Sequence, residues 1–258
     1  MDANENLIYS KDGHIATIRL NRPEKLNTVT AAMGKRISEL VVEVNYDDDV
    51  RVVILTGTGE RAFSAGSDVK VLDDYGSNWQ LRNRIDYARE MWRIRKPVIA
   101  QIRGYCIGGG LEMALVSDVR IASETAKFGA GEVKLGWNGG AGNTQLLPRL
   151  VGYGKAMQML ITGDLIDAQE AYRTGLVQEV TPDDQLEAKV MQIAEAAAKN
   201  APIAVQAIKH LVRMSESTAV DVGLAWENDL FAYCFTTEDA AEGQAAFKEK
   251  RPPEFKGK

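Results

Sequence analysis

Two glutamates and two loops of small residues are the parts of this sequence that could perform chemistry. Three consecutive glycines, Gly108 to Gly110, precede a segment that reads as a helix, with Glu112 in its first turn. Unpaired N–H groups at a helix start carry partial positive charge and can bind an oxygen that gains negative charge. The segment "ERAFSAGSDVK", residues 60–70, is a second such loop. One amide from each loop would form an oxyanion hole; simple turns with close-packed glycines are the structural alternative.

Glu132, which lies 20 residues after Glu112, could be the second of two catalytic carboxylates. It follows a short predicted strand in "KFGAGEVKLG". Neighbouring carboxylates can share one proton near neutral pH, because repulsion and partial desolvation oppose the second negative charge. Taken singly, Glu112 could instead be an acid that stabilises a helix start, and Glu132 could belong to a surface salt bridge.

Other chemistries have little support in the sequence. It contains no Gly-x-Ser-x-Gly elbow, no Gly-x-x-x-x-Gly-Lys-Ser/Thr phosphate loop and no Gly-x-Gly-x-x-Gly motif between a strand and a helix. Cys106 and Cys234 lack metal-ligand spacing, and His14 and His210 are the only histidines. We therefore expect no metal site, no nucleotide cofactor and a reducing compartment.

The composition is typical of a soluble globular protein. The chain has 258 residues, 45% of them hydrophobic, and a net charge of -5, which gives no attraction to nucleic acid or to an anionic membrane. No stretch approaches the roughly 20 apolar residues needed to span a bilayer, and the N-terminus does not resemble a signal peptide. We expect a cytoplasmic protein with neither a membrane nor a nucleic acid as partner.

The pattern of hydrophobic residues predicts an α/β protein with a helical C-terminal third. β-Branched runs predict strands at 14–21, 50–57, 97–104 and 118–123, with helices at 30–45 and 78–95 between them. Beyond about residue 140, helical periodicity appears at 153–162, 167–174, 182–200, 202–214 and 217–232, with one strand at 175–180. Thr181 is the predicted N-cap of the helix at 182–200.

Motifs along nearly the whole chain together resemble the crotonase family, also called the enoyl-CoA hydratase/isomerase superfamily. The segments that carry the resemblance are "IRLNRPEKLNTVT", "RAFSAGSDVKVL", "KPVIAQIRGYCIGGGLEMALVSDVRIAS", "FGAGEVKLG", "GGAGNTQLLPRLVG", "AMQMLITGDLIDAQEAYRTGLVQEV" and "AAFKEKRPPEF". The resemblance implies a crotonase-like spiral of ββα units, expected at residues 1–200, and a helical C-terminal trimerisation region at 201–258. It also implies an acyl-CoA substrate and a homotrimer or a hexamer made of two trimers.

Carried over by position, the resemblance assigns roles to the residues above. The amides of Ser67 and Gly109 would bind the thioester oxygen as an enolate forms. Relatives that hydrate 2-enoyl-CoA esters have glutamates at the positions of both Glu112 and Glu132, whereas isomerases commonly keep only the second. Having both favours hydration or the reverse dehydration, with Glu112 orienting and deprotonating water and Glu132 protonating C2.

Further residues resemble the family's contacts with coenzyme A, which is part of the substrate, so no separate cofactor is expected. The contacts implied for the nucleotide and phosphates are Lys25, Leu26, Ala65, Asp68 and Val69. Phe247 and Lys250 resemble tail residues that close the coenzyme A site, with a neighbouring subunit as one source of them.

The sequence departs from the family pattern between residues 135 and 146. Gly139 stands where relatives have Pro, Asn143 where they have Gly, and Leu146 where they have Arg. Trp137 and Asn138 are unusual residues for an acyl pocket, and they predict a short, branched, cyclic or polar acyl group unless they point outward.

A double-bond isomerase or a thioester hydrolase is the alternative activity. A non-catalytic RNA-binding or scaffolding trimer is disfavoured by the acidic balance and both glutamates.

Overall fold

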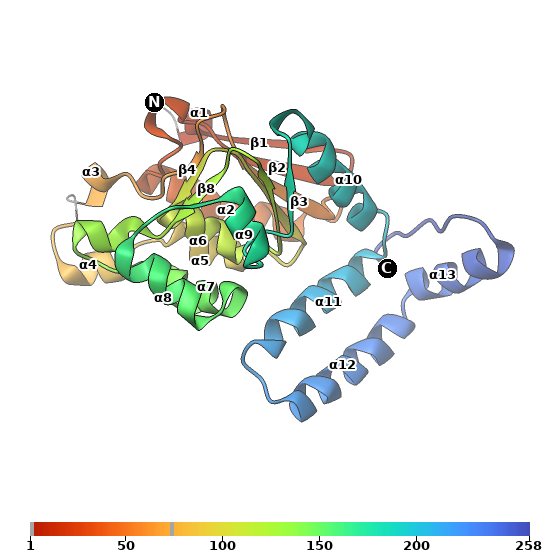
Figure 1. Ribbon diagram of the computed structural model, residues 1–258. Helices are drawn as coiled ribbons and strands as arrows, with labels where there is room; N and C mark the ends of the chain where they lie inside the picture. The colour runs from red at the N-terminus through yellow and green to blue at the C-terminus, as the bar shows by residue number, and fades with distance from the viewer. Residues whose placement is uncertain (1–2, 73–74) are drawn as a thin grey trace.

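The computed structural model describes residues 3–72 and 75–258, and a six-stranded sheet forms its centre (Figure 1). The strand order is β1-β2-β3-β5-β7-β10, and all neighbours are parallel except β1 and β2. The bounds are β1 (Leu7–Asp12), β2 (Ile15–Leu20), β3 (Val52–Gly57), β5 (Val98–Ile102), β7 (Val119–Ser123) and β10 (Glu179–Thr181). The four strands predicted in the first half are β2, β3, β5 and β7, which confirms those predictions. The strand predicted at 175–180 is the shorter β10.

A second sheet of short strands runs in the order β4-β6-β8-β9. Its members are β4 (Ala62–Ser64), β6 (Tyr105–Ile107), β8 (Lys127–Gly129) and β9 (Ile166–Asp167). The chain passes from β3 to β4, from β5 to β6 and from β7 to β8, so each step along the central sheet adds one strand to each sheet. Two- and three-residue strands are too short for a periodic pattern, and only β8 was predicted.

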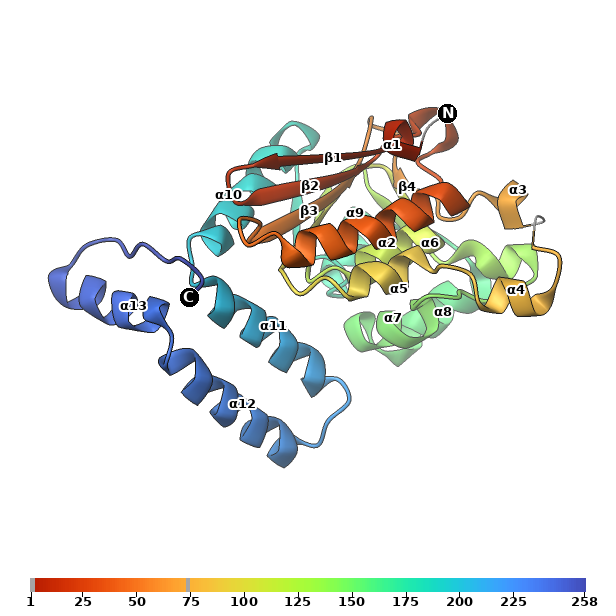
Figure 2. The same cartoon turned by 180° about the vertical axis from the view of Figure 1, so that it is seen from behind.

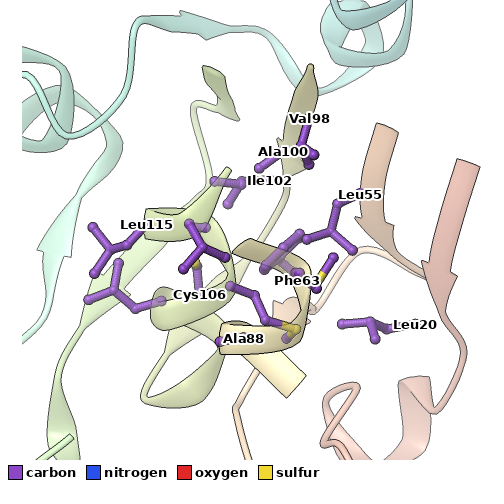
Figure 3. Packing of buried hydrophobic residues seen from close by; sticks show 14 of the residues in the cluster. Leu20, Leu55, Phe63, Ala88, Val98, Ala100, Ile102, Cys106 and Leu115 are labelled. Carbon is purple, nitrogen blue, oxygen red and sulfur yellow. The ribbon is translucent and has the colours of Figure 1, made fainter. Parts of the chain in front are cut away.

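Helices cover both faces of the central sheet (Figure 2). On one face lie α2 (Ala31–Tyr46), α5 (Tyr87–Trp92) and α6 (Gly109–Val116), whose apolar residues share the main core with β3, β5 and β6. Figure 3 shows part of that core, including Leu55, Phe63 and Leu115. On the other face, α10 (Leu186–Ala198) packs Leu186, Val190 and Ala194 against the sheet.

Two predictions about helix boundaries were wrong. The helix predicted at 78–95 is broken into α4 (Asn78–Arg82) and α5, because the Asp86 carboxylate accepts a hydrogen bond from the Arg89 amide and starts a new helix. Thr181 is not an N-cap, because it pairs with Ser123 in the sheet as the last residue of β10. A 3-10 turn, η3 (Asp183–Gln185), separates it from α10.

The remaining helices surround the site and form the C-terminal region. They are α1 (Ala3–Asn6), η1 (Pro23–Lys25), α3 (Val69–Leu72), η2 (Gly131–Leu135), α7 (Asn143–Val151), α8 (Tyr153–Thr162), α9 (Ala168–Arg173), α11 (Pro202–Ser215), α12 (Val220–Phe235) and α13 (Glu238–Glu249). The helices predicted at 153–162, 167–174, 202–214 and 217–232 are α8, α9, α11 and α12, whereas α7 and α13 were not predicted. Within the described ranges, no helix is both long and apolar enough to cross a bilayer.

The helices α11 to α13 extend away from the body of the molecule (Figures 1 and 2). Two cations of α11 hold the region to the body: Lys209 donates to the Lys96 carbonyl at 2.7 Å, and Arg213 pairs with Asp118 at 3.0 Å. The Arg213 guanidinium also lies 4.0 Å from the centre of the Trp92 ring. Large apolar side chains on this region remain exposed, namely Ile208, Val212, Leu224, Trp226, Phe231, Tyr233 and Phe235. The division of the chain at residue 200 stays a prediction.

Candidate active site

The two predicted oxyanion loops touch each other at their glycines. A Cβ atom on Gly66 would lie 2.5 Å from the Gly109 nitrogen, and Gly66 has φ +86°, so only glycine suits this position. Gly109 is the first residue of α6, and its N–H lies where a helix has no internal acceptor. No hydrogen bond joins the amides of Ser67 or Gly109 to another described residue. Both amides can therefore donate to a bound oxygen.

Tyr87, which the sequence analysis missed, supports both loops from α5. Its hydroxyl lies 3.0 Å from the Ser67 hydroxyl, and it would be only 1.9 Å from a Cβ atom on Gly109. Burial raises the pKa of Tyr87, and the negative charges of Glu112 and Asp86 act in the same direction, so the phenol stays neutral. A tyrosine within a helical pattern carries no sequence signal for this role.

Glu112 projects from the first turn of α6 and is only 5% exposed. Its Oε1 accepts a hydrogen bond of 2.7 Å from the Ala141 amide, just before α7. Burial raises the pKa of Glu112 to about 7, aided by the negative charges of Glu132 and Asp86 and opposed by the amides of Ala141 and Asn143. A carboxyl group with this pKa can both accept and donate a proton near neutral pH.

Glu132 approaches the same point from η2, which follows β8. Asn143, at the start of α7, donates its side-chain amide to Glu132 Oε1 at 2.7 Å. Glu132 Oε2 is buried and accepts no hydrogen bond within the described chain. A Cβ atom on Gly139 would lie 2.9 Å from Glu112 Oε1 and 3.0 Å from Asn143 Nδ2, so these groups converge beside Gly139.

One cavity of about 610 Å³ brings most of the predicted site residues together. Ser67, Gly109, Glu112 and Glu132 line it, as do Ala65, Val69, Trp137 and Asn138. Arg84, which the sequence analysis missed, is the only cation in this lining among the described residues, and it pairs with Asp86 at 3.5 Å. Trp137 and Asn138 thus lie on the cavity wall, with the Asn138 amide donating to the Gly139 carbonyl at 2.7 Å.

Comparison with known proteins gives the family of this chain. A sequence model described as "Enoyl-CoA hydratase/isomerase" matches residues 10–258. The chain belongs to this family. It is 39% identical to the short-chain-enoyl-CoA hydratase of Clostridium acetobutylicum, with 95% of each chain covered. It is also 39% identical to the (E)-benzylidenesuccinyl-CoA hydratase of Thauera aromatica, over 95% of this chain and 96% of the relative.

A solved structure supports the same family and its fold. The enoyl-CoA hydratase of Bacillus anthracis superposes with a TM-score of 0.93 at 39% identity, over 98% of this chain and 100% of that one. The mixed α/β body with two strands and a helix per repeat, followed by C-terminal helices, is therefore the crotonase fold that the sequence predicted.

The other residues that family resemblance assigned to coenzyme A lie outside the lining of the cavity. Lys25 is exposed at the end of η1, and the Leu26 carbonyl accepts a hydrogen bond from the Ala65 amide at 2.9 Å, which joins this turn to the oxyanion loop. Asp68 pairs with Arg22 at 3.1 Å. Phe247, 86% exposed, and Lys250 belong to the end of α13, on the opposite side of the molecule from α3 and α4 (Figures 1 and 2). They cannot reach the cavity of their own chain.

The turn before the oxyanion loop depends on Asn27, another residue the sequence analysis passed over. Asn27 is fully buried with φ +54°, and its side-chain amide donates to the Ala62 carbonyl at 2.7 Å and the Thr58 carbonyl at 3.0 Å.

Within residues 3–72 and 75–258, no three His, Cys, Asp or Glu side chains lie close enough together to hold a metal ion.

The raised pKa of Glu112 predicts that this residue destabilises the fold at alkaline pH. The carboxyl titrates near 4.5 when unfolded and near 7 when folded, so the folded chain binds more protons between these values. The free energy of unfolding should therefore fall as pH rises through that interval. We expect Glu112→Gln to be about 3 kcal/mol more stable than wild type above pH 8 and nearly equal to it below pH 4. Denaturant unfolding at a series of pH values measures the difference; a pH-independent difference would contradict the assigned pKa.

Proposed function

We propose that this protein adds water to the double bond of a 2-enoyl-CoA thioester, or removes it from the 3-hydroxyacyl-CoA. The observation that carries the proposal is the convergence of two carboxylates, Glu112 and Glu132, on one cavity. The same cavity contains the amides of Ser67 and Gly109, which have no hydrogen-bond partner among the described residues. Relatives named enoyl-CoA hydratases support the same reaction.

In the proposed mechanism, the amides of Ser67 and Gly109 bind the thioester oxygen. For hydration, Glu112 takes a proton from water as the water oxygen bonds to C3, and electrons of the double bond move toward the thioester oxygen. The enolate then takes a proton from Glu132 at C2, which restores the thioester carbonyl. The reaction consumes one water molecule and needs no oxidant, and the pair begins and ends each turnover with one proton.

Two other activities of the family use parts of the same site. A double-bond isomerase moves a proton between carbons and needs one carboxylate, so it leaves Glu112 without a task. A thioester hydrolase would direct water to C1 and release free thiol. The non-catalytic alternative is less consistent with Glu112, because burying a carboxyl group that ionises near neutral pH costs stability with no return.

The test is a set of acyl-CoA thioesters incubated with the enzyme and analysed by mass spectrometry. We expect 2-enoyl esters to gain the mass of one water while coenzyme A stays attached, with loss of the conjugated thioester absorbance. Free thiol would instead indicate a hydrolase, and a shifted double bond at constant mass an isomerase.

The proposal includes the contacts with coenzyme A and the assembly. Lys25, the backbone around Leu26, and Ala65, Asp68 and Val69 would contact the nucleotide and phosphates. The Asp68 carboxylate is paired with Arg22 and its amide donates to the Val29 carbonyl. Phe247 and Lys250 would act on the site of a neighbouring subunit in a trimer or hexamer. The exposed apolar side chains of α11 and α12 support such an assembly, which light scattering can measure.

We expect Trp137 to limit the length of the acyl chain. The indole lines the cavity together with Asn138 and Arg84, so a bulky ring reduces the volume left for a long alkyl chain. Wild type should therefore prefer crotonyl-CoA to dodecenoyl-CoA, and Trp137→Ala should reduce that preference by about tenfold. The comparison is kcat/KM for both esters in both proteins. A wild-type preference for the long ester, or an unchanged ratio in the variant, would show that Trp137 does not limit the pocket.

A further inference from the structure

Asn143 is a buried polar side chain in direct contact with the candidate catalytic pair. It is fully buried at the first residue of α7. Its Nδ2 lies 2.7 Å from Glu132 Oε1 and 3.5 Å from the Gly108 carbonyl oxygen.

In this contact the Asn143 side chain donates the hydrogen bond and the Glu132 carboxylate accepts it. An ionised carboxylate only accepts hydrogen bonds, and a side-chain amide nitrogen only donates them. Donation to a carboxylate stabilises its charged form. Within the described chain, Asn143 is the only side chain that donates to Glu132, so removing its amide would remove the main polar stabilisation of that charge.

Glu112 lies in the opposite kind of environment. Burial and the negative charges of Glu132 and Asp86 favour the protonated form of Glu112. The backbone amides of Ala141 and Asn143 act in the opposite direction. The other charged or titratable groups near the pair are Arg84, which pairs with Asp86, and the neutral phenol of Tyr87. None of these side chains donates a hydrogen bond to Glu132 in the described structure.

We propose that Asn143 is a positioning residue that holds Glu132 as the carboxylate base at C2 and leaves the single proton of the pair on Glu112. The inference rests on the proposed function and adds the protonation state of the resting site. The two oxygens of Glu132 differ: Oε1 accepts a hydrogen bond from Asn143, and Oε2 has no donor among the described residues.

This resting state is the one that dehydration of a 3-hydroxyacyl-CoA requires. The C2–H bond breaks, its proton goes to the Glu132 carboxylate, and the electron pair moves toward the thioester oxygen held by the amides of Ser67 and Gly109. The C3–O bond then breaks as the Glu112 proton joins the leaving hydroxyl, which departs as water. Hydration follows the same path backwards, so the proton must first pass from Glu112 to Glu132.

The test isolates the step at C2 by using a saturated ester. Butyryl-CoA cannot eliminate water, so exchange of its C2 hydrogens in heavy water requires only the base and the oxyanion hole. The exchange rate is measured by mass spectrometry across pH for wild type, Asn143→Gly and Asn143→Leu. Gln145→Leu, the same amide-to-leucine change at an exposed position two residues along α7, is the matched control.

We expect exchange by wild type to decline at acid pH, where protonation removes the carboxylate base. In Asn143→Gly and Asn143→Leu this decline should move to higher pH by about one unit, so that exchange on the acid side falls about tenfold while the alkaline plateau changes much less. Gln145→Leu should keep the wild-type profile. Thermal unfolding of each variant checks that it is folded. Gly leaves a cavity at this position and Leu fills it, so an effect shared by both variants comes from loss of the side-chain amide.

The outcomes separate this inference from the proposed function. If wild type hydrates 2-enoyl esters but both Asn143 variants keep the wild-type acid limb, Asn143 does not control Glu132 and the inference is overturned. A rate reduced equally at every pH would also overturn it, because that pattern indicates packing alone. If wild type neither hydrates 2-enoyl esters nor exchanges butyryl-CoA, the proposed function itself is wrong.

Discussion

Replacing either glutamate of the pair should reduce turnover by at least about a hundredfold, because general acid and base contributions are typically of that size or larger. In Glu112→Gln the side-chain oxygen can still accept the hydrogen bond from the Ala141 backbone amide, but the side chain cannot deprotonate water. In Glu132→Gln the side chain cannot exchange a proton with C2. We expect kcat for a 2-enoyl-CoA to fall in both variants while the Kd of the ester changes little, since neither carboxylate binds the nucleotide.

The controls for these two variants come from the same structure. Glu124→Gln changes an exposed acid that follows β7 and should retain wild-type kcat. Unfolding cannot explain a loss of turnover in Glu112→Gln, because this variant should be the more stable protein at alkaline pH. The double variant should have about the same activity as the less active single variant, because the two groups act in one proton-transfer path. Turnover near wild type in either single variant would eliminate the two-carboxylate mechanism.

Gly109→Ala should have a comparably large effect through the oxyanion hole. The added Cβ would lie 1.9 Å from the Tyr87 hydroxyl and 3.2 Å from Gly66 Cα, so α6 and the Ser67 loop must move apart. Both donors to the thioester oxygen would then be misplaced. Loss of one such donor typically costs about a hundredfold to a thousandfold in kcat, and we expect a reduction of at least that size.

Gly131→Ala is the matched control for this substitution. Gly131 lines the same cavity, but a Cβ atom there would have no heavy atom within 4 Å, so kcat should change little. Adding Tyr87→Phe to Gly109→Ala removes the closest obstructing atom and should restore part of the lost turnover, because the next ring atom is 3.0 Å from the Cβ. If Gly109→Ala retains wild-type kcat, the Gly109 amide does not stabilise the reacting oxygen.

The sequence predicted those parts of the molecule whose pattern is long or whose residue type is unusual. The strands β2, β3, β5 and β7 were found because they contain runs of β-branched residues between turn residues. The glycines before α6 and the acid in its first turn were found because glycine and carboxylate have few roles at a helix start. Local chemistry therefore pointed to residues that the structure places along one cavity.

The contacts between distant segments could not be predicted in this way. Tyr87 meets Ser67 and Gly109 only because α5 packs beside α6, and Asn143 meets Glu132 only because α7 begins beside η2. Asn143 was noticed as a departure from the family pattern, but its direction was not evident. The second sheet was missed because its strands have two or three residues each and are specified by their neighbours.

The most direct test of the central claim is to incubate crotonyl-CoA with the enzyme in water labelled with heavy oxygen and to locate the label by mass spectrometry. If Glu112 and Glu132 direct water to the double bond, one labelled oxygen should appear on C3 of a product that still carries coenzyme A, and Glu112→Gln and Glu132→Gln should form it at least about a hundredfold more slowly. Label in a free carboxylic acid with release of thiol, or an unlabelled product with a shifted double bond, would contradict the account.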